Sequence, residues 1–208
     1  MKTRKVTIID YGMGNLISLQ NAFNYVNAKV IISNSSKEIS KSEIVVLPGV
    51  GSYPKAMKII KKENLDYAIK KVIKRGNFLF CICLGMQLLG SSSTEEKYTK
   101  GLEIINNKVE KFKLKEINNK KIPHVGFNKI NFDTRNKFFN GIKNGADFYF
   151  VHSYRMLQEK LKNNISVTNY GINFLSSFNI NNIYATQFHP EKSQANGLKL
   201  LDNFIKLT

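Results

Sequence analysis

Cysteine is scarce in this sequence, because only Cys81 and Cys83 occur among 208 residues. The two lie two positions apart in an apolar stretch, so a bridge between them could not join distant parts of the chain. A chain of this length also buries enough core to fold without disulfides. This usage indicates a reducing compartment and argues against the disulfide-rich secreted class.

Long hydrophobic runs are missing as well. No stretch approaches the roughly 18 apolar residues that a membrane span requires. The charged start, Met1 to Lys5, is followed by an apolar stretch too short for a signal peptide. We therefore expect a cytoplasmic protein with no membrane contact. No linker, repeat or low-complexity stretch divides the chain, which predicts a single domain over residues 1–208.

Acidic residues are few. Asp and Glu number 15 against 32 Lys and Arg, and the formal net charge is +17. Such a balance raises the possibility of nucleic-acid binding, but the lysines are scattered. Neither an arginine-rich tract nor an aromatic ladder with interleaved basic residues is present. The pattern favours a solvated lysine-rich surface without a nucleic-acid partner, and a surface for an acidic partner is the alternative.

The first part of the chain alternates short apolar runs with amphipathic segments. The apolar runs predict buried strands at residues 6–10, 30–32, 44–47 and 78–82. A 3.6-residue apolar period predicts helices at about 16–26, 55–74 and 84–89, with Gly76 ending the longest one. Continuous apolar strands between helices are typical of a parallel sheet covered on both faces.

Beyond Gly101 the pattern changes to strands joined by Asn- and Gly-containing turns, followed by a helix at 197–207. The expected strands are 101–112, 121–132, 147–154, 165–168, 175–178 and 183–188. The sequence therefore predicts an α/β fold with a mixed, mostly parallel central sheet flanked by helices, and a strand-rich C-terminal half.

The segment Cys81-Ile-Cys83-Leu-Gly85 places a thiol where a buried strand turns sharply into a helix. Such a nucleophile elbow exposes the side chain above the sheet. The following helix N-terminus favours a thiolate over a thiol. A crowded turn needs small residues two positions before and after the nucleophile, and Cys81 and Gly85 are both small. We expect Cys83 to be a nucleophile.

Two further motifs follow predicted strands. In His189-Pro-Glu191 a carboxylate two residues beyond a histidine can hold that histidine in one tautomer as a base. In Pro48-Gly-Val-Gly51 the glycines allow backbone N–H groups to turn toward an oxyanion. All three motifs fall at carboxyl ends of strands, where open α/β sheets bind ligands. The loop Gly12-Met-Gly14 lacks the third glycine of a dinucleotide site, so we expect no cofactor, and nothing indicates a metal.

Together, in the chain order of the loop at 48–51, the Cys83 elbow and His189-Pro-Glu191, the three motifs resemble the class I (triad-type) glutamine amidotransferases, and within them the glutaminase subunits of imidazole glycerol phosphate synthase. The resemblance covers nearly the whole chain. It also includes Asp10-Tyr-Gly-Met-Gly-Asn15, Ile122-Pro-His-Val-Gly126 and Tyr149-Phe-Val-His152. It implies the family's fold and the hydrolysis of glutamine. It also implies transfer of ammonia to a (β/α)₈-barrel cyclase in a heterodimer of histidine biosynthesis.

The resemblance also implies residue roles. Cys83 is the nucleophile, His189 the general base and then acid, and Glu191 orients His189. Other positions match glutamine-binding, oxyanion-loop and partner-facing sites of the family. The glutamine-binding set is Gly51, Leu84, Gln87, Ser153 and Tyr154; the oxyanion loop is Gly49, Val50 and Gly51; and the partner-facing pair is Tyr149 and Lys192.

Two departures from the family pattern keep alternatives open. Cys81 stands where the family usually has Gly, and Val125 and Phe127 stand where it usually has Met and Trp. Because the latter pair borders the partner interface, the acceptor could instead be an enzyme that builds amidino groups on surface sugars. A catalytically idle binding module is the alternative of another class. His124 and His152 lack a neighbouring carboxylate in sequence, so we expect structural or interface roles for them.

Overall fold

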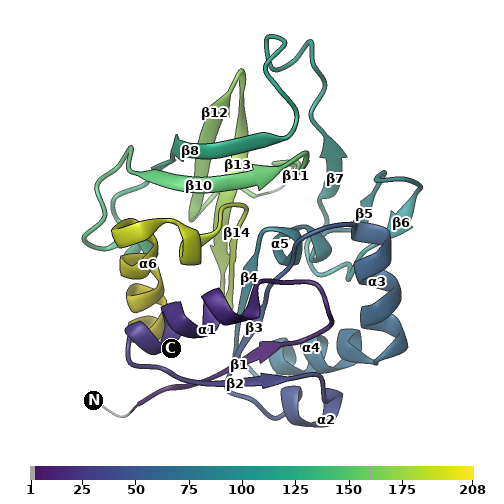
Figure 1. Cartoon of the computed structure of the whole chain (residues 1–208), viewed down its shortest axis with the longest axis vertical. Coiled ribbons are helices and arrows are strands. Elements are labelled where there is room, and N and C mark those ends of the chain that lie inside the picture. Colours follow the sequence, from purple (N-terminus) through teal and green to yellow (C-terminus); the bar gives the residue numbers. More distant parts are fainter. Residues whose placement is uncertain (1–2, 160) are drawn as a thin grey trace.

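The central feature of the computed structural model, which describes residues 3–159 and 161–208, is an eight-stranded sheet (Figure 1). Its strand order is β2-β1-β3-β4-β14-β13-β12-β9. The bounds are β1 Lys5–Ile9, β2 Lys29–Ser33, β3 Ile44–Leu47, β4 Phe78–Ile82, β9 Asn131–Phe132, β12 Ile165–Tyr170, β13 Ile172–Ile180 and β14 Ile183–Thr186.

Neighbouring strands from β2 to β14 run parallel, and β13, β12 and β9 continue the sheet antiparallel. The sheet is therefore mixed and mostly parallel, which confirms the prediction. The central parallel strands β3, β4 and β14 are buried on both faces, as the uninterrupted apolar sequence of β3 requires, whereas the edge strand β2 is partly exposed.

Helices cover both faces of the parallel part. Helices α3 (Tyr53–Lys62) and α4 (Leu65–Lys74) pack on one face, and α1 (Leu16–Tyr25) and α6 (Gln194–Leu207) pack on the other (Figure 1). Because side chains alternate along a strand, β3 contributes to two separate cores. Val45 and Leu47 face α3 and α4, whereas Ile44 and Val46 face α1 and α6.

Two smaller sheets lie beyond the carboxyl ends of the parallel strands (Figure 1). One pairs β8 with β10, and the other has the order β11-β7-β5-β6. Their bounds are β5 Ser92–Ser93, β6 Thr99–Lys100, β7 Lys108–Lys111, β8 His124–Lys129, β10 Asp147–His152 and β11 Tyr154–Met156; the short helices are α2 Ser36–Ile39, α5 Leu84–Leu88, η1 Lys137–Phe139 and η2 Pro190–Lys192. These sheets cover the carboxyl-end edge of the parallel strands, where the loop 48–51, Cys83 and His189 lie.

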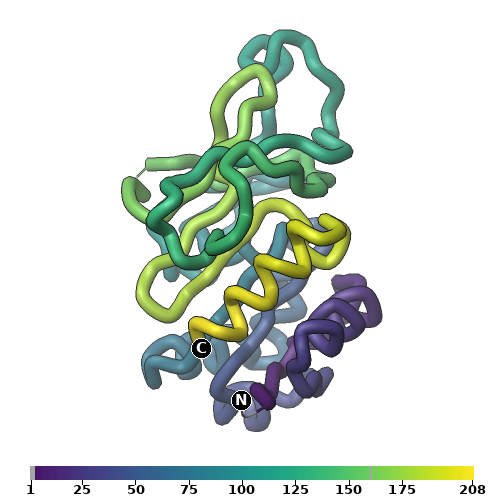
Figure 2. Tube along the Cα trace, turned by 90° about the vertical axis from the view of Figure 1, so that its left-hand side faces the viewer, coloured from purple at the N-terminus to yellow at the C-terminus, as the bar shows by residue number. Residues whose placement is uncertain are grey.

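Helix α6 begins near β10 and runs away from the two small sheets (Figure 1). Figure 2 shows α6 running beside α1, and the two helices are in contact. Among the described residues, no helix combines the length and apolar character needed to cross a membrane.

The single helix predicted over residues 55–74 is wrong, because the chain forms α3 and α4 with a break between them. Asn64 adopts a left-handed conformation with φ 53° and ψ 29°, which interrupts the α-helical hydrogen bonding. The apolar period continues across the break, since both helices bury their apolar faces against the same side of the sheet. Periodicity therefore did not reveal the interruption.

The strand predicted over residues 101–112 is also too long, since only β7 is extended. The backbone N–H groups of Leu102 and Ile105 donate to the carbonyls of Leu88 and Leu89. These carbonyls, at the end of α5, have no partner within the helix. The predicted strands 121–132 and 147–154 are each divided, the latter at Ser153 between β10 and β11.

Gly76 ends α4 as predicted. Its φ is +75°, its N–H donates to the Ile73 carbonyl, and the N–H of Asn77 donates to the Val72 carbonyl. This pattern is a Schellman cap with the left-handed residue at Gly76. A Cβ added there would meet no heavy atom within 4 Å, so a substitution tests backbone conformation alone.

We expect Gly76→Ala to lower the free energy of unfolding by about 1 kcal/mol, because alanine resists the left-handed conformation. Gly76→Asn should lower it less, since asparagine tolerates that conformation. Urea denaturation of both variants beside the parent chain measures the effect. Equal losses in the two variants would contradict a conformational origin.

Candidate active site

Cys83 occupies a strained turn between β4 and α5. Its φ of 54° and ψ of −108° are unfavourable for a residue with a side chain. The Cys83 N–H donates to the Thr186 carbonyl at 2.7 Å. A Cβ on Gly85 would lie 2.0 Å from the Leu47 carbonyl oxygen, so this close approach to β3 requires glycine. The structure thus forms the crowded elbow that the sequence predicts.

Cys81 differs sharply from its neighbour. It is fully buried in the core beneath α3 and α4, whereas Cys83 belongs to the opposite core. Desolvation by burial raises the pKa of the Cys81 thiol well above its ordinary value. Cys81 is therefore an inert core residue.

His189 and Glu191 form a buried pair beside this elbow. His189 Nδ1 lies 2.8 Å from Glu191 Oε1, and both side chains are only 2% exposed. The intervening Pro190 begins η2, which turns the carboxylate back toward the imidazole. Since a carboxylate accepts, Nδ1 carries the proton and Nε2 is left to face the reaction.

The environment of His189 favours its charged form. Burial by itself lowers the pKa of His189, but the nearby Cys83 sulfur and the Glu191 carboxylate outweigh burial and raise the pKa to about 10. At neutral pH the imidazole is therefore protonated. A proton held there is available to a leaving group in contact with Cys83.

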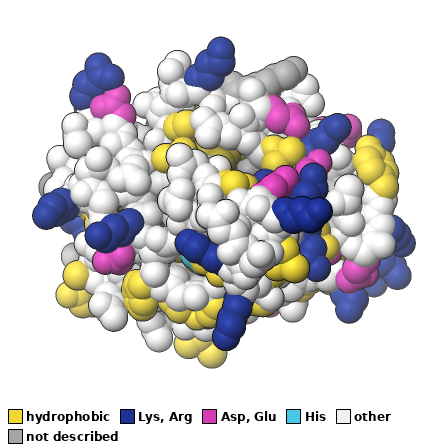
Figure 3. Space-filling model, turned by 90° about the horizontal axis from the view of Figure 1, so that it is seen from above, with side chains coloured by type: hydrophobic (Ala, Val, Ile, Leu, Met, Phe, Trp, Pro, Cys, Tyr) yellow, Lys and Arg dark blue, Asp and Glu magenta, His cyan; other side chains and the backbone are white. Residues whose placement is uncertain are grey.

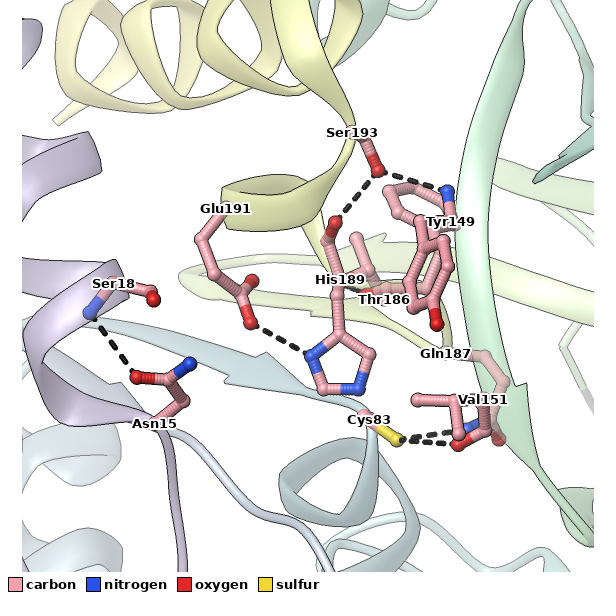
Figure 4. Close-up of polar contacts among 11 residues, drawn as sticks. Asn15, Ser18, Cys83, Tyr149, Val151, Thr186, Gln187, His189, Glu191 and Ser193 are labelled. Carbon is pink, nitrogen blue, oxygen red and sulfur yellow. Dashed lines mark hydrogen bonds and ion pairs between the residues drawn. The ribbon is translucent and has the colours of Figure 1, made fainter. Parts of the chain in front are cut away.

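The Cys83 sulfur lies among polar groups. Figure 4 shows the His189 ring between Glu191 and Cys83, with Nε2 on the cysteine side. This buried Nε2 has no hydrogen-bond partner among the described residues. The sulfur lies 3.9 Å from the Val151 carbonyl oxygen and 3.6 Å from Nε2 of Gln187. The three side chains that the sequence predicts to form a triad, Cys83, His189 and Glu191, are thus brought together.

A cavity of about 640 Å³ opens above Cys83. It brings together all five residues expected to bind substrate, together with Val50 and Lys192. The complete lining is Val50, Gly51, Ser52, Cys83, Leu84, Gln87, Glu95, Pro123, Val151, His152, Ser153, Tyr154 and Lys192. His189 and Glu191 are not part of this lining. Of the three expected triad residues, only Cys83 lines the cavity, and the His189 ring lies between Cys83 and Glu191.

The main chain of the loop 48–51 contacts the N–H of Leu84, a residue expected to bind glutamine. The N–H of Leu84 donates to the Gly49 carbonyl at 3.3 Å, so it is not free for a ligand. The Tyr11 hydroxyl donates to the Pro48 carbonyl at 2.7 Å and holds the loop from the other side. The loop lies close to Cys83 as expected, and in this conformation its Gly49 carbonyl accepts the Leu84 N–H.

Tyr149 and Lys192, the expected partner-facing pair, are in contact. The Lys192 ammonium lies 5.7 Å from the centre of the Tyr149 ring, a cation–π arrangement. The Tyr149 carbonyl accepts from the His189 N–H at 2.9 Å. The pair therefore adjoins His189, and Lys192 also lines the cavity.

His124 and His152 pair with each other instead of with an acid. Nδ1 of His124 lies 3.1 Å from Nε2 of His152, and Nδ1 of His152 lies 2.8 Å from the Tyr154 carbonyl oxygen. Desolvation lowers the pKa of His124 to about 4 and that of His152 to about 3. Both rings are therefore neutral, in keeping with the expected structural role.

Sequence reasoning assigned no role to two side chains at the site, Glu95 and Gln187. Glu95 lines the cavity from the loop after β5, where no motif marks it. Gln187 contacts the Cys83 sulfur and follows directly after β14, two residues before His189. The signal for Gln187 was its position at a carboxyl strand end, where the site residues gather.

We expect a haloacetamide to alkylate Cys83 and to leave Cys81 unmodified in the folded protein. Cys83 faces a cavity, whereas Cys81 is fully buried with a raised pKa. Peptide mapping by mass spectrometry after short exposure gives the modified position. Label on Cys81 under native conditions would reverse the choice of nucleophile, and labelling of both after denaturation is the control.

Comparisons with known proteins agree with this geometry. The family model for glutamine amidotransferase class-I matches residues 7–207. Imidazole glycerol phosphate synthase subunit HisH 2 of Methanococcus maripaludis is 46% identical, with 97% of this chain and 98% of the relative covered. Subunit HisH of Aquifex aeolicus is 42% identical, with 96% and 95% covered.

Solved structures at lower identity share the fold. The structure of PurLQS from Thermotoga maritima has a TM-score of 0.75 at 15% identity and covers 99% of both chains. A glutamine amidotransferase from the same organism has a TM-score of 0.64 at 17% identity, covering 100% of this chain and 83% of that one. The chain therefore belongs to the class-I glutamine amidotransferases, and within them to the HisH subunits of imidazole glycerol phosphate synthase.

Proposed function

We propose that this chain is the glutaminase subunit of an imidazole glycerol phosphate synthase and supplies ammonia to a (β/α)₈-barrel cyclase in histidine biosynthesis. The carrying observation is the buried contact of His189 with Glu191 beside Cys83, beneath a cavity that holds all five expected glutamine-binding residues. The high identity to HisH subunits over nearly the full length supports the pathway.

The reaction follows from the protonation of the site. The Cys83 thiolate attacks the amide carbon of glutamine, and the carbonyl electrons move to the oxygen. Collapse of this intermediate breaks the C–N bond, and the nitrogen takes the proton of His189 and leaves as ammonia. Neutral His189 then removes a proton from water, whose oxygen attacks the thioester and breaks the C–S bond. The new carboxylic acid releases its proton to solvent.

Glu95 fits the substrate's α-ammonium group. It is the one carboxylate among the described residues that line the cavity. Burial raises the pKa of Glu95 above its ordinary value. The N–H of Tyr53, which donates to the carboxylate at 3.1 Å, offsets part of this rise. A cationic group beside this carboxylate offsets the burial of its charge. Gln87, Ser153 and Tyr154 line the cavity with Glu95 and complete the glutamine site.

The loop 48–51 is suited to gate the reaction. In the structure, the N–H of Leu84 donates to the Gly49 carbonyl and is therefore not available to a substrate oxygen. Rotation of the peptide between Gly49 and Val50 would release this N–H and turn the N–H of Val50 toward the same place. Glycine permits either orientation at little conformational cost. One movement would thus supply two oxyanion donors, each worth about 10²–10³ in rate.

The partner docks on the face that carries Tyr149 and Lys192 in this proposal. Ammonia is mostly ammonium at neutral pH and is then not a nucleophile, so it must pass directly into the synthase. On the adjoining β8, Val125 and Phe127 leave 56% and 50% of their surface exposed, which suits burial against another protein. The same exposed pair differs from the usual family residues, and this favours a sugar-modifying acceptor enzyme as the second candidate.

The positive charge of the chain does not form a single continuous patch on this end. Seen from above, Lys and Arg side chains are spread around the face, with Asp, Glu and hydrophobic groups between them (Figure 3). A dispersed charge is that of a solvated surface, and it supports a protein partner more than a nucleic acid.

We expect Cys83→Ala to abolish glutamine-dependent synthesis and to leave ammonia-dependent synthesis by the complex intact, because the thiol serves hydrolysis alone. The measurement is product formation by the chain with its cyclase, fed glutamine or ammonium salt. Cys81→Gly is the matched control and should retain activity. Glutamine turnover by the alanine variant would contradict the assignment.

Glu95→Gln should raise the KM for glutamine at least about tenfold and change kcat much less, since it removes a charge that binds the ground state. Steady-state glutaminase kinetics of the complex measure both constants. Glu96→Gln is the control, because Glu96 accepts from Ser52 at 2.9 Å and does not line the cavity. An unchanged KM in Glu95→Gln would remove Glu95 from the substrate site.

The isolated chain should hydrolyse glutamine slowly, and the cyclase with its ligand should stimulate it at least about a hundredfold, as the loss of one donor implies. Val50→Pro lacks one of the two N–H groups that the peptide rotation provides, so it should lose about 10²–10³ of the stimulation and keep the slow basal rate. Val50→Ala is the control. Rapid turnover by the isolated chain, unchanged by the partner, would contradict gating.

A further inference from the structure

Gln187 is a buried side chain next to the nucleophile that the mechanism above does not use. It is 0% exposed and follows β14 directly. Its Nε2 lies 3.6 Å from the Cys83 sulfur, and its Oε1 lies 3.0 Å from Nε2 of Gln87 (Figure 4 shows the Cys83 contact). Its backbone N–H donates to the Ser176 carbonyl at 2.8 Å, and this hydrogen bond fixes the backbone from which the side chain extends.

The orientation of this amide follows from its neighbours. The Tyr154 carbonyl can only accept, so the Gln87 atom 2.8 Å from it must be the NH₂ group. The same NH₂ group lies 3.0 Å from Gln187, which must therefore present its oxygen there. The remaining end of the Gln187 amide, its NH₂ group, then faces the Cys83 sulfur.

A donor aimed at sulfur favours the thiolate. Hydrogen bonds to the charged form of a group stabilise that form, and the effect is stronger where water is excluded. The His189 ring and the Gln187 amide lie on different sides of the Cys83 sulfur, and of the two only the contact of Gln187 with the sulfur is a hydrogen bond in the structure (Figure 4). Gln187 is uncharged, so its contribution does not change when His189 gives up its proton.

We propose that Gln187 is a further catalytic residue, whose side-chain N–H donates to the Cys83 sulfur and holds it as an oriented thiolate through the reaction. The inference rests on the proposed glutaminase function. It also assigns a purpose to the contact between Gln187 and Gln87, which locks the amide in the donating orientation. The substrate-binding Gln87 and the nucleophile are thus joined through one side chain.

The test measures the alkylation rate of Cys83 by iodoacetamide against pH, with Cys83 followed by peptide mapping, beside glutaminase kinetics of the cyclase complex. Gln187→Met removes the donor and keeps the bulk. Gln187→Glu keeps the shape and the acceptor toward Gln87, but turns an oxygen toward the sulfur. Ser176→Ala is the control, a buried hydroxyl near Gln187 that does not contact Cys83.

We expect the alkylation midpoint to move upward by about one pH unit in Gln187→Met and further in Gln187→Glu, as the loss of a donor to a charged group implies. The kcat should fall about ten- to hundredfold while the KM stays within about threefold. Ser176→Ala should leave the midpoint unchanged. Thermal unfolding checks that each variant is folded, and the nearly isosteric Gln187→Glu carries the test if Gln187→Met is not.

An unchanged alkylation midpoint in the folded variants would overturn the inference, even with a lower kcat, because a purely structural role would reduce turnover without altering the thiolate. A rise in KM alone would assign Gln187 to the support of Gln87 and would also overturn it. If Cys83 of the parent chain showed no enhanced reactivity at neutral pH, the proposed glutaminase function itself would fail.

Discussion

The strained turn at Cys83 is the constraint on which the rest of this site depends. The backbone there adopts φ 54°, a conformation that neighbouring strands must hold in place. The hydrogen bond to Thr186 of β14 fixes one side, and the approach of Gly85 to the Leu47 carbonyl of β3 fixes the other. Because β3, β4 and β14 are consecutive in the parallel sheet, the sheet itself positions the sulfur.

The electrostatics of the site follow from that placement. A buried imidazolium would be unfavourable alone, but His189 lies between the Glu191 carboxylate and the Cys83 sulfur, and its pKa rises to about 10. Its charge is therefore compensated on both sides within a largely dry environment. The oxyanion loop differs in this respect, since the Gly49 carbonyl turns its negative end toward the place where an oxyanion would form. Near a sulfur that the sheet holds in position, the N–H of Leu84 is thus occupied by the protein's own carbonyl, and the proposed gating by the loop 48–51 rests on this contact.

Motifs that depend on local geometry were predictable from sequence, and contacts between distant segments were not. The elbow at Cys83 and the His189–Glu191 pair are each encoded within a few residues, so spacing was enough to find them. Glu95 reaches the cavity from an irregular loop, and its carboxylate accepts from the N–H of Tyr53 at the start of α3, which is a contact between distant segments. The break at Asn64 was missed because both helices bury the same face, and residues 101–107 were misassigned because their N–H groups bond to the end of α5. In both cases tertiary packing determined the backbone.

The charges of Cys83 and His189 are expected to be coupled, because the Cys83 sulfur contributes to the raised pKa of His189. Titration of His189 with and without that sulfur measures the coupling. Imidazole NMR signals of the three histidines, assigned with His124→Asn and His152→Asn variants, would be followed from pH 5 to 11 in the parent chain and in Cys83→Ala. We expect His189 to stay protonated through pH 8 and to lose its proton near pH 10, and removal of the sulfur should lower this pKa. A His189 pKa near 6.5 in both proteins would contradict this coupling.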